Sequence, residues 1–138
     1  MSIFSSYVVH EHLAKIAGRH YDLRIQIPRH RLLASWALPK AHIPIHYGEK
    51  VLAIKGQDHG AYWLYFEGNI PAGQYGYGSI KILESGVLEI LGWSDRFITF
   101  IGQGNIVHGR YHLTKFKPKE KNTDTWILLK GKDKEERG

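Results

Sequence analysis

The chain has 138 residues, 43% hydrophobic and 23% charged, which is the composition of an ordinary soluble globular protein. It contains no cysteine, and this excludes disulfides, thiolate zinc sites, iron–sulfur clusters and a cysteine nucleophile. The formal net charge of +6 favours nucleic acid as a partner, although many small proteins are basic for solubility alone.

Short apolar or alternating runs recur along the chain and are separated by Gly, Pro, Asn or Asp. They predict strands at residues 7–9, 20–27, 32–38, 50–55, 62–67, 75–83, 86–91, 96–101, 106–114 and 125–130. Only residues 12–17 have a mildly helical pattern, which Gly18 would end. We therefore expect a mainly β protein, a compact single-domain β-barrel with one or two short helices.

One domain is expected to include residues 1–138, because no Pro- or Ser-rich linker divides the chain. Residues 116–124 are typical of a charged loop, and residues 131–138 of a charged, frayed tail. No apolar run is long enough to cross a bilayer, and the N-terminus lacks the pattern of a signal peptide. These features predict a cytoplasmic protein.

The segment from His20 to Ile27 alternates strictly between polar and apolar residues. Because successive side chains of a strand face opposite sides, one face carries His20, Asp22, Arg24 and Gln26. Residues two apart on a strand are separated by roughly 7 Å, so His20 and Asp22 can bind one ion. Imidazole and carboxylate together suit Mn, Fe or Zn better than calcium. Arg24, one step further on, would hold an anion bound to that ion.

A further candidate ligand lies just upstream, in His10-Glu11-His12, where a short turn could fold His12 back toward the same ion. The alternative is a solvent-facing strand face on which Asp22 and Arg24 form a surface pair. Spacing alone leaves both interpretations open.

Two other segments combine polar residues with a strand end. Lys40 follows Pro39 at the rim of a predicted strand, where it could contact phosphate or simply be solvated. In Gln57-Asp58-His59, His59 could be a phosphate ligand, a general acid or part of a surface loop. The glycine-rich stretch 66–78 is interpreted as backbone architecture, because no Gly-Lys-Ser/Thr follows it.

Seven segments, in this order, resemble the 3′-phosphoesterase domain of bacterial DNA ligase D and its free-standing relatives. They are Tyr7-Val8-Val9-x-x-His12, His20-Tyr21-Asp22-Leu23-Arg24, Ser35-Trp36-Ala37-Leu38-Pro39-Lys40, Asp58-His59, Phe66-Glu67-Gly68-x-Ile70-Pro71-x-Gly73-x-Tyr75-Gly76-x-Gly78, Gly109-Arg110-Tyr111-x-Leu113 and Trp126-Ile127-Leu128-Leu129-Lys130. Together they extend over residues 7–130, nearly the whole chain.

The resemblance implies a small β-barrel that needs a divalent metal, typically Mn²⁺, with Co²⁺ or Zn²⁺ as alternatives. It implies removal of a 3′-terminal ribonucleoside and then of the 3′-phosphate, so that nucleic acid is left with a 3′-hydroxyl. His12, His20 and Asp22 would be the metal ligands. Arg24 and His59 would hold the scissile phosphate with support from Lys40. A DNA ligase acting in repair would be a natural partner.

The chain departs from the family pattern at a few positions. The stretch between His12 and His20 is two residues longer than usual, which makes His10 an alternative ligand. Val51 stands where a basic residue is usual, and Gln57 where Glu is usual. A missing phosphate contact could then come from Lys50 or Lys55. Asp58, next to His59, is a further candidate site residue.

Two rival functions remain. His20-x-Asp22 with a later histidine also fits the ligand pattern of a non-haem iron oxygenase. The basic residue that a 2-oxoglutarate enzyme needs after the distal histidine is absent, since position 69 is Asn69 and the next arginine is Arg96. The other rival is a catalytically silent nucleic-acid-binding barrel that stacks bases on aromatic side chains. Its candidates are Tyr62, Trp63, Tyr75 and Tyr77.

Overall fold

The computed structural model describes residues 3–116 and 124–133, and nearly all of them lie in strands or the turns between strands. The strands are β1 (Ile3–Ala14), β2 (Gly18–Gln26), β3 (Leu32–Leu38), β4 (Lys50–Lys55), β5 (His59–Gly60), β6 (Gly68–Ile70), β7 (Gly78–Trp93), β8 (Phe97–Gln103), β9 (His108–Lys115) and β10 (Thr125–Lys130). A short 3₁₀ helix, η1 (Ala61–Leu64), is the only helix in these two ranges.

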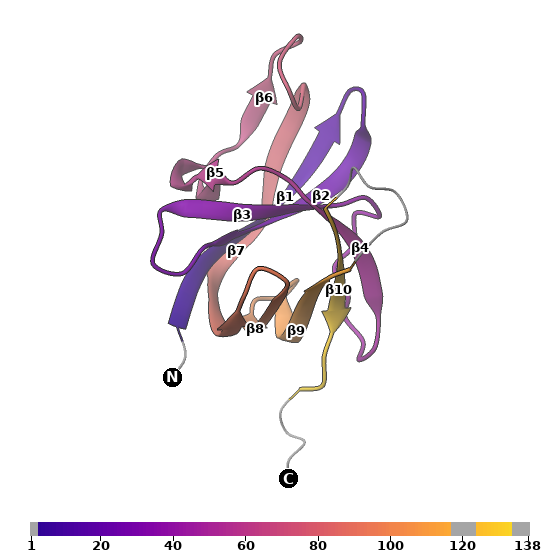
Figure 1. The fold of residues 1–138 in the computed structure, drawn as a ribbon. Coiled ribbons are helices and arrows are strands. Elements are labelled where there is room, and N and C mark those ends of the chain that lie inside the picture. The colour runs from indigo at the N-terminus through magenta and orange to yellow at the C-terminus, as the bar shows by residue number, and fades with distance from the viewer. Residues whose placement is uncertain (1–2, 117–123, 134–138) are drawn as a thin grey trace.

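Eight of the strands close into an antiparallel barrel (Figure 1). The hydrogen-bonded order is β1-β2-β3-β4-β10-β9-β8-β7, and pairing of β1 with β7 joins the two ends. The short strands lie outside this ring, with β5 paired to β3 and β6 paired to β7. Closure gives β1 a partner on each side, which protects the edge that an open sheet would expose. The mainly β barrel predicted from the sequence is confirmed.

The barrel interior holds the main hydrophobic core, and the alternation along β2 determines which of its residues lie there. Leu23 and Ile25 are fully buried in this core, with Tyr21 and Ile27 packed at its border. The polar residues between them therefore point to the outside of the barrel. The sequence pattern predicted two faces correctly, and the structure shows that the polar face is the outer one.

A second, smaller cluster lies on this outer face. Val8 of β1 and Leu33 of β3 pack there against Leu64 of η1, with Trp63 and Ile82 at the border. The 3₁₀ helix thus covers part of the outer surface of β1 and β3. By covering this patch, η1 shields the neighbouring polar side chains on the outer face of the barrel from solvent.

Several predicted elements differ from those observed. The helix predicted at 12–17 is wrong, because β1 continues to Ala14 and is followed by a turn at 15–17. Pairing with both β2 and β7 overrides the weak helical preference of this segment. The strand predicted at 62–67 is largely replaced by η1, and the strands predicted at 75–83 and 86–91 form the single strand β7.

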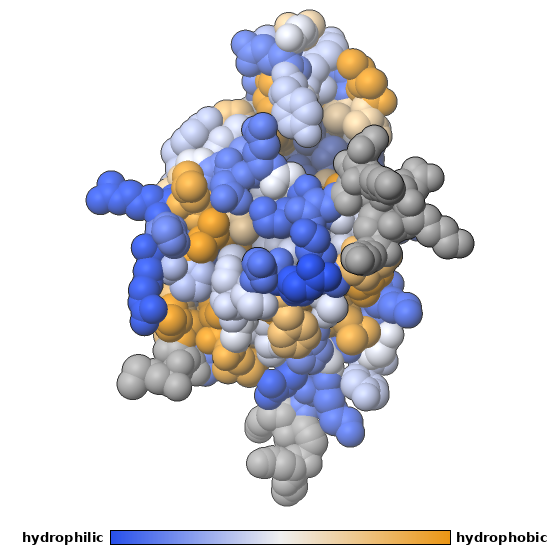
Figure 2. Space-filling model, in the orientation of Figure 1, coloured by the Kyte–Doolittle hydropathy of each residue, from blue (hydrophilic) through white to orange (hydrophobic). Residues whose placement is uncertain are grey.

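Two strand ends project together beyond the barrel. The turn that joins β1 and β2 lies beside the start of β7, where Ala14 pairs with Gly78 and the Lys15 N–H donates to the Tyr77 carbonyl at 2.8 Å. In Figure 1 these ends rise above the ring of strands. Figure 2 shows the β6–β7 end as an upper lobe that mixes hydrophilic and hydrophobic side chains.

Parts of two predicted segments lie outside the described residues. They are residues 117–123 of the predicted charged loop and residues 134–138 of the predicted tail. Residues 131–133 run past the end of β10, where the Gly131 N–H donates to the Arg110 carbonyl at 2.8 Å. Within the described part of the chain, no helix has the length and apolar character needed to span a bilayer.

Candidate metal centre and phosphate site

The three predicted metal ligands lie together on the outer face of β1 and β2. His12 and His20 are directly opposite each other in the β1–β2 ladder, and Asp22 follows two positions after His20 on the same face. One ligand atom from each of the three lies within 4.8 Å of the others. His12 and Asp22 are buried and His20 is partly buried. The chain between His12 and His20 turns at residues 15–17, and the two histidines pair directly across this hairpin.

In their neutral tautomers, the two histidines each turn a ring lone pair toward Asp22. His12 Nε2 lies 2.7 Å from the Gly76 carbonyl, and His20 Nδ1 lies 3.3 Å from the Gly18 carbonyl. A carbonyl can only accept, so these two nitrogens carry the protons of the neutral rings. The opposite nitrogens then face carboxylate oxygens of Asp22 at 3.5 and 3.4 Å. Acceptors that face one another in this way suit a cation between them.

The electrostatics keep Asp22 ionised. Burial alone would raise the pKa of its carboxyl, but His12, His20 and Arg24 lower that pKa below its usual range. The interaction with Asp22 also raises the pKa of His20. A buried, ionised carboxylate between two imidazoles is a donor set for a divalent transition metal.

Arg24 lies next to this cluster and is held on three sides. Its Nη1 donates to Ser35 Oγ at 2.5 Å, its Nε to His10 Nδ1 at 3.1 Å and its Nη2 to Asp22 Oδ2 at 3.3 Å. The guanidinium carbon lies 5.0 Å from the ring centroid of Trp63. A guanidinium fixed in this way is preorganised to bind an anion at the site.

His10 takes a supporting position and not a ligand position. Its Nε2 donates to the Phe66 carbonyl at 3.0 Å, so its Nδ1 is the acceptor for Arg24. Both ring nitrogens are therefore engaged away from the metal cluster. Burial and the adjacent Arg24 lower the pKa of His10 to about 4, which keeps the ring neutral and able to accept from Arg24. The structure thus gives His12, and not His10, the geometry of a ligand.

His59 reaches the same region from β5. Its ring is half-buried and packs edge-on against Trp63 at a centroid distance of 5.2 Å. Its Nδ1 is buried and has no hydrogen-bond partner in the described part of the chain. Burial and Arg24 lower its pKa, so the ring is neutral near pH 7. Trp63 therefore contacts both His59 and Arg24, the two predicted phosphate ligands.

Among the described residues, no hydrogen bond or ion pair joins the remaining predicted residues to the cluster. Lys40 is exposed in the turn after β3, two residues beyond Leu38. Lys55 Nζ lies 3.3 Å from Asp58 Oδ1, and Gln57 is exposed in the loop between them. Of the two lysines at the ends of β4, Lys55 lies at the end that pairs with β3. Lys50 lies at the other end, where it pairs with Leu129 of β10.

Val51, at the position where the resemblance predicted a basic residue, packs against the barrel core. Its side chain is therefore part of the hydrophobic packing and offers nothing to a phosphate.

Three supporting residues were missed by the sequence reasoning. The sequence pattern indicates Ser35 only as part of a motif, Trp63 only as a possible base-stacking residue, and Gly76 only as part of a turn. Each contacts a site residue from a different strand, helix or loop: Ser35 and Trp63 contact Arg24, and Gly76 contacts His12. The one available signal for Ser35 was its position on the strand following Arg24, where antiparallel pairing places polar side chains side by side.

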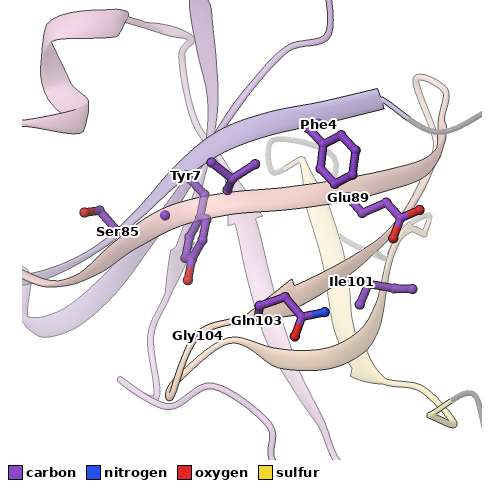
Figure 3. A pocket seen from close by; sticks show the side chains of 9 residues that line it. Phe4, Tyr7, Ser85, Glu89, Ile101, Gln103 and Gly104 are labelled. Carbon is purple, nitrogen blue, oxygen red and sulfur yellow. The ribbon is translucent and has the colours of Figure 1, made fainter.

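A separate cavity of about 430 Å³ lies on the outside of β1, β7 and β8 (Figure 3). It is lined by Phe4, Tyr7, Ser85, Gly86, Val87, Glu89, Ile101, Gln103 and Gly104. None of the predicted metal or phosphate ligands lines it. The chemistry-bearing residues and this cavity are therefore distinct features of the surface.

Comparison with known proteins identifies similar chains. A family model described as the DNA Ligase D 3′-phosphoesterase domain matches residues 10–115, which include the three predicted metal ligands, Arg24 and His59. The multifunctional non-homologous end joining protein LigD of Pseudomonas aeruginosa is 33% identical over 136 residues, and that of Mycolicibacterium smegmatis is 34% identical over 142 residues. A Mycobacterium tuberculosis LigD is 33% identical over 137 residues.

These matches cover nearly all of this chain but little of the relatives. They cover 95%, 92% and 96% of this chain, in the order given above. The chain spans only 16–17% of the length of these curated relatives. The similarity therefore concerns one part of much longer proteins.

Proposed function

Because this chain belongs to the family of DNA ligase D 3′-phosphoesterase domains, we propose that it is a divalent-metal-dependent phosphoesterase acting on the 3′ ends of nucleic acid. It removes a 3′-terminal ribonucleoside, then the remaining 3′-phosphate, and leaves a 3′-hydroxyl. That product is what a ligase needs, so we propose that the chain works with a DNA ligase in end-joining repair. Its relatives in Pseudomonas aeruginosa and Mycolicibacterium smegmatis are multifunctional non-homologous end joining proteins, which supports this context.

One observation carries the proposal: ring nitrogens of His12 and His20 and a carboxylate oxygen of Asp22 converge beside the fixed guanidinium of Arg24. His12, His20 and Asp22 fit Mn²⁺, and also Co²⁺ or Zn²⁺, because the set combines imidazole nitrogen with carboxylate oxygen. A divalent ion held there would supply Lewis acidity toward a phosphoryl oxygen. The formal charge of +6 adds a general attraction for a polyanionic substrate.

The residues around the ligands would bind and orient the phosphate. Arg24 presents a planar guanidinium that stabilises negative charge as it develops on the phosphoryl oxygens. His59, neutral near pH 7, offers one ring N–H as a donor to a phosphate oxygen. Lys40 and Lys55 would add longer-range attraction for the backbone of the nucleic acid. Trp63 and η1 shield this region from water on one side.

The test uses a 5′-labelled primer–template that ends in a 3′-phosphate or in a single 3′-ribonucleotide. We expect conversion of both to a 3′-hydroxyl with Mn²⁺, no conversion with EDTA, and no conversion by Asp22→Ala. Asp95→Ala, which removes an exposed carboxylate from the turn between β7 and β8, is the matched control and should retain activity.

Two results would contradict the proposal. Absence of conversion with Mn²⁺, Co²⁺ and Zn²⁺ would favour a catalytically silent nucleic-acid-binding barrel. Full activity in Asp22→Ala would show that the reaction occurs elsewhere. Turnover distinguishes the two roles, because affinity for the primer–template should survive in His20→Ala and Asp22→Ala under both. In the phosphoesterase these changes should abolish the turnover of the wild type, whereas a silent binder has no turnover to lose.

A further inference from the structure

The turn between β6 and β7, residues 71–77, forms one wall of the candidate site. It is folded tightly, with backbone hydrogen bonds from Gln74 N to the Pro71 carbonyl and from Tyr77 N to the Gln74 carbonyl. Lys15 N fastens it to the β1–β2 turn through the Tyr77 carbonyl. This turn also supplies the Gly76 carbonyl that orients His12. Its position relative to the metal ligands is therefore fixed.

At the centre of this turn, Tyr75 is 98% exposed. Its ring gains almost nothing from packing, so the fold itself gives no account of an aromatic residue here. The residue nevertheless lies close to the chemistry. It directly precedes Gly76, whose carbonyl oxygen lies 2.7 Å from Nε2 of the predicted metal ligand His12. An exposed ring thus stands at the rim of the candidate site.

A nucleic acid end would bring a planar base to this position. When Arg24 binds the terminal phosphate, the nucleoside attached to that phosphate must lie within the length of one nucleotide from Arg24. Stacking on an aromatic side chain works with every base, because each base has a π-face, and it needs no hydrogen-bond pattern. A rigid turn that presents the ring in advance reduces the ordering cost of such contact.

We propose that Tyr75 stacks on the base of the 3′-terminal nucleoside and makes the site selective for ends that carry a base. This inference rests on the proposed function, since it assumes that Arg24 binds the terminal phosphate. Tyr75 would be a specificity-determining residue, and the chemical step would remain the work of the cluster and Arg24. Loss of the ring should affect substrate binding more than turnover.

The experiment compares two primer–templates, both ending in a 3′-phosphate. One carries an ordinary 3′-terminal nucleoside and the other a tetrahydrofuran abasic residue. For the wild type with Mn²⁺, we expect the KM for the ordinary end to be roughly tenfold lower than for the abasic end. Tyr75→Ala should raise the KM for the ordinary end to the abasic value, with kcat and the abasic KM nearly unchanged. Tyr75→Phe, which keeps the ring, should behave like the wild type.

Tyr47→Ala is the matched control. Tyr47 is also exposed, at 71%, but it lies just before Lys50, at the end of β4 opposite to Lys55. It should preserve the preference for the ordinary end. Equal KM values for the two ends in the wild type, or an equal loss on both ends in Tyr75→Ala, would overturn the inference while leaving the phosphoesterase intact. If the wild type removes phosphate from neither end, the proposed function fails and the inference fails with it.

Discussion

Arg24 and Ser35 lie directly opposite each other in the β2–β3 ladder, and Arg24 Nη1 donates to Ser35 Oγ at 2.5 Å. Both side chains are buried on the outer face of the barrel. A buried guanidinium needs partners that satisfy its donors without neutralising it, and a hydroxyl does so. His10, in its neutral form, has the same role at Nε. Arg24 thus keeps a full positive charge beside a single carboxylate.

Ser35→Ala should therefore impair the site through Arg24. The change removes an acceptor from a buried donor, which costs about 1–3 kcal/mol of folding stability. We also expect kcat/KM on a 3′-phosphate end to fall by roughly tenfold or more, because the guanidinium loses one of its fixed positions. Urea unfolding and steady-state kinetics measure the two effects.

Ser85→Ala is the matched control for this change, because Ser85 is exposed on β7. It should alter neither quantity. If Ser35→Ala retained full kcat/KM, Ser35 would have no part in positioning Arg24.

Metal binding should stabilise the protein through Asp22. Mn²⁺ that binds only the folded state at one hundred times its dissociation constant adds about 2.7 kcal/mol of stability. We expect the melting temperature of the wild type to rise by several degrees with Mn²⁺, and that of Asp22→Asn not to rise. Thermal unfolding with and without EDTA measures this, and Asp95→Asn should respond like the wild type. An equal rise in Asp22→Asn would place the metal elsewhere.

The sequence was sufficient to predict the local part of this site. Strict alternation from His20 to Gln26 placed His20, Asp22 and Arg24 on one face, and the structure has them there. Alternation cannot show whether that face lies inside or outside the barrel, because both faces of β2 are largely buried. The outer face is buried through residues distant in sequence, namely those of η1 and the β6–β7 turn.

The helix predicted at residues 12–17 was wrong because contacts between residues distant in sequence determine this segment too. Its residues have only a weak preference for helix, and β1 extends through Ala14 because β2 and β7 both pair with it. The direct pairing of His12 with His20 depends on this extension, so the wrong helix prediction fell on the strand that brings His12 to the other two predicted metal ligands. Long-range pairing decided the outcome, and short-range pattern does not contain that information.

Tyr111 predicts a loss of stability at high pH. Its hydroxyl donates to the Pro44 carbonyl at 2.8 Å, and burial raises its pKa to about 12, compared with about 10 in the unfolded chain. Between these values the folded state retains a proton that the unfolded state releases, so stability falls as pH rises from 10 to 12. We expect a total fall of at most roughly 2 kcal/mol, reduced by partial solvent screening.

Tyr111→Phe should remove this part of the pH dependence, as measured by urea unfolding between pH 9 and pH 12. At pH 7 it should also cost about 1 kcal/mol, because the Pro44 carbonyl loses its donor. Tyr47→Phe, at an exposed position, should keep the slope of the wild type. An unchanged slope in Tyr111→Phe would assign the effect to other tyrosines.

Gly78 lies where the β1–β2 turn meets the β6–β7 turn, and it pairs with Ala14. Substitution of Gly78 should lower both the stability of the fold and the affinity of the predicted metal site. The φ of Gly78 is +147°, and a Cβ at this position would lie 2.2 Å from the Leu13 carbonyl oxygen and 2.8 Å from the Ala14 Cα. Both are backbone atoms, so Gly78→Ala must separate β7 from β1. We expect a loss of about 3 kcal/mol or more of folding stability. The Gly76 carbonyl should move with the turn, so Mn²⁺ affinity should fall as well.

Gly73→Ala isolates the steric part of this effect. Gly73 also has positive φ, at +87°, but nothing lies within 4 Å of the Cβ that alanine would add. Only the left-handed backbone conformation is penalised there, which costs about 1–2 kcal/mol. Urea unfolding and Mn²⁺ titration of both variants should therefore show a small stability loss with normal metal affinity for Gly73→Ala, and a large loss of both for Gly78→Ala. Equal behaviour of the two variants would mean that the contact between the turns does not support the metal ligands.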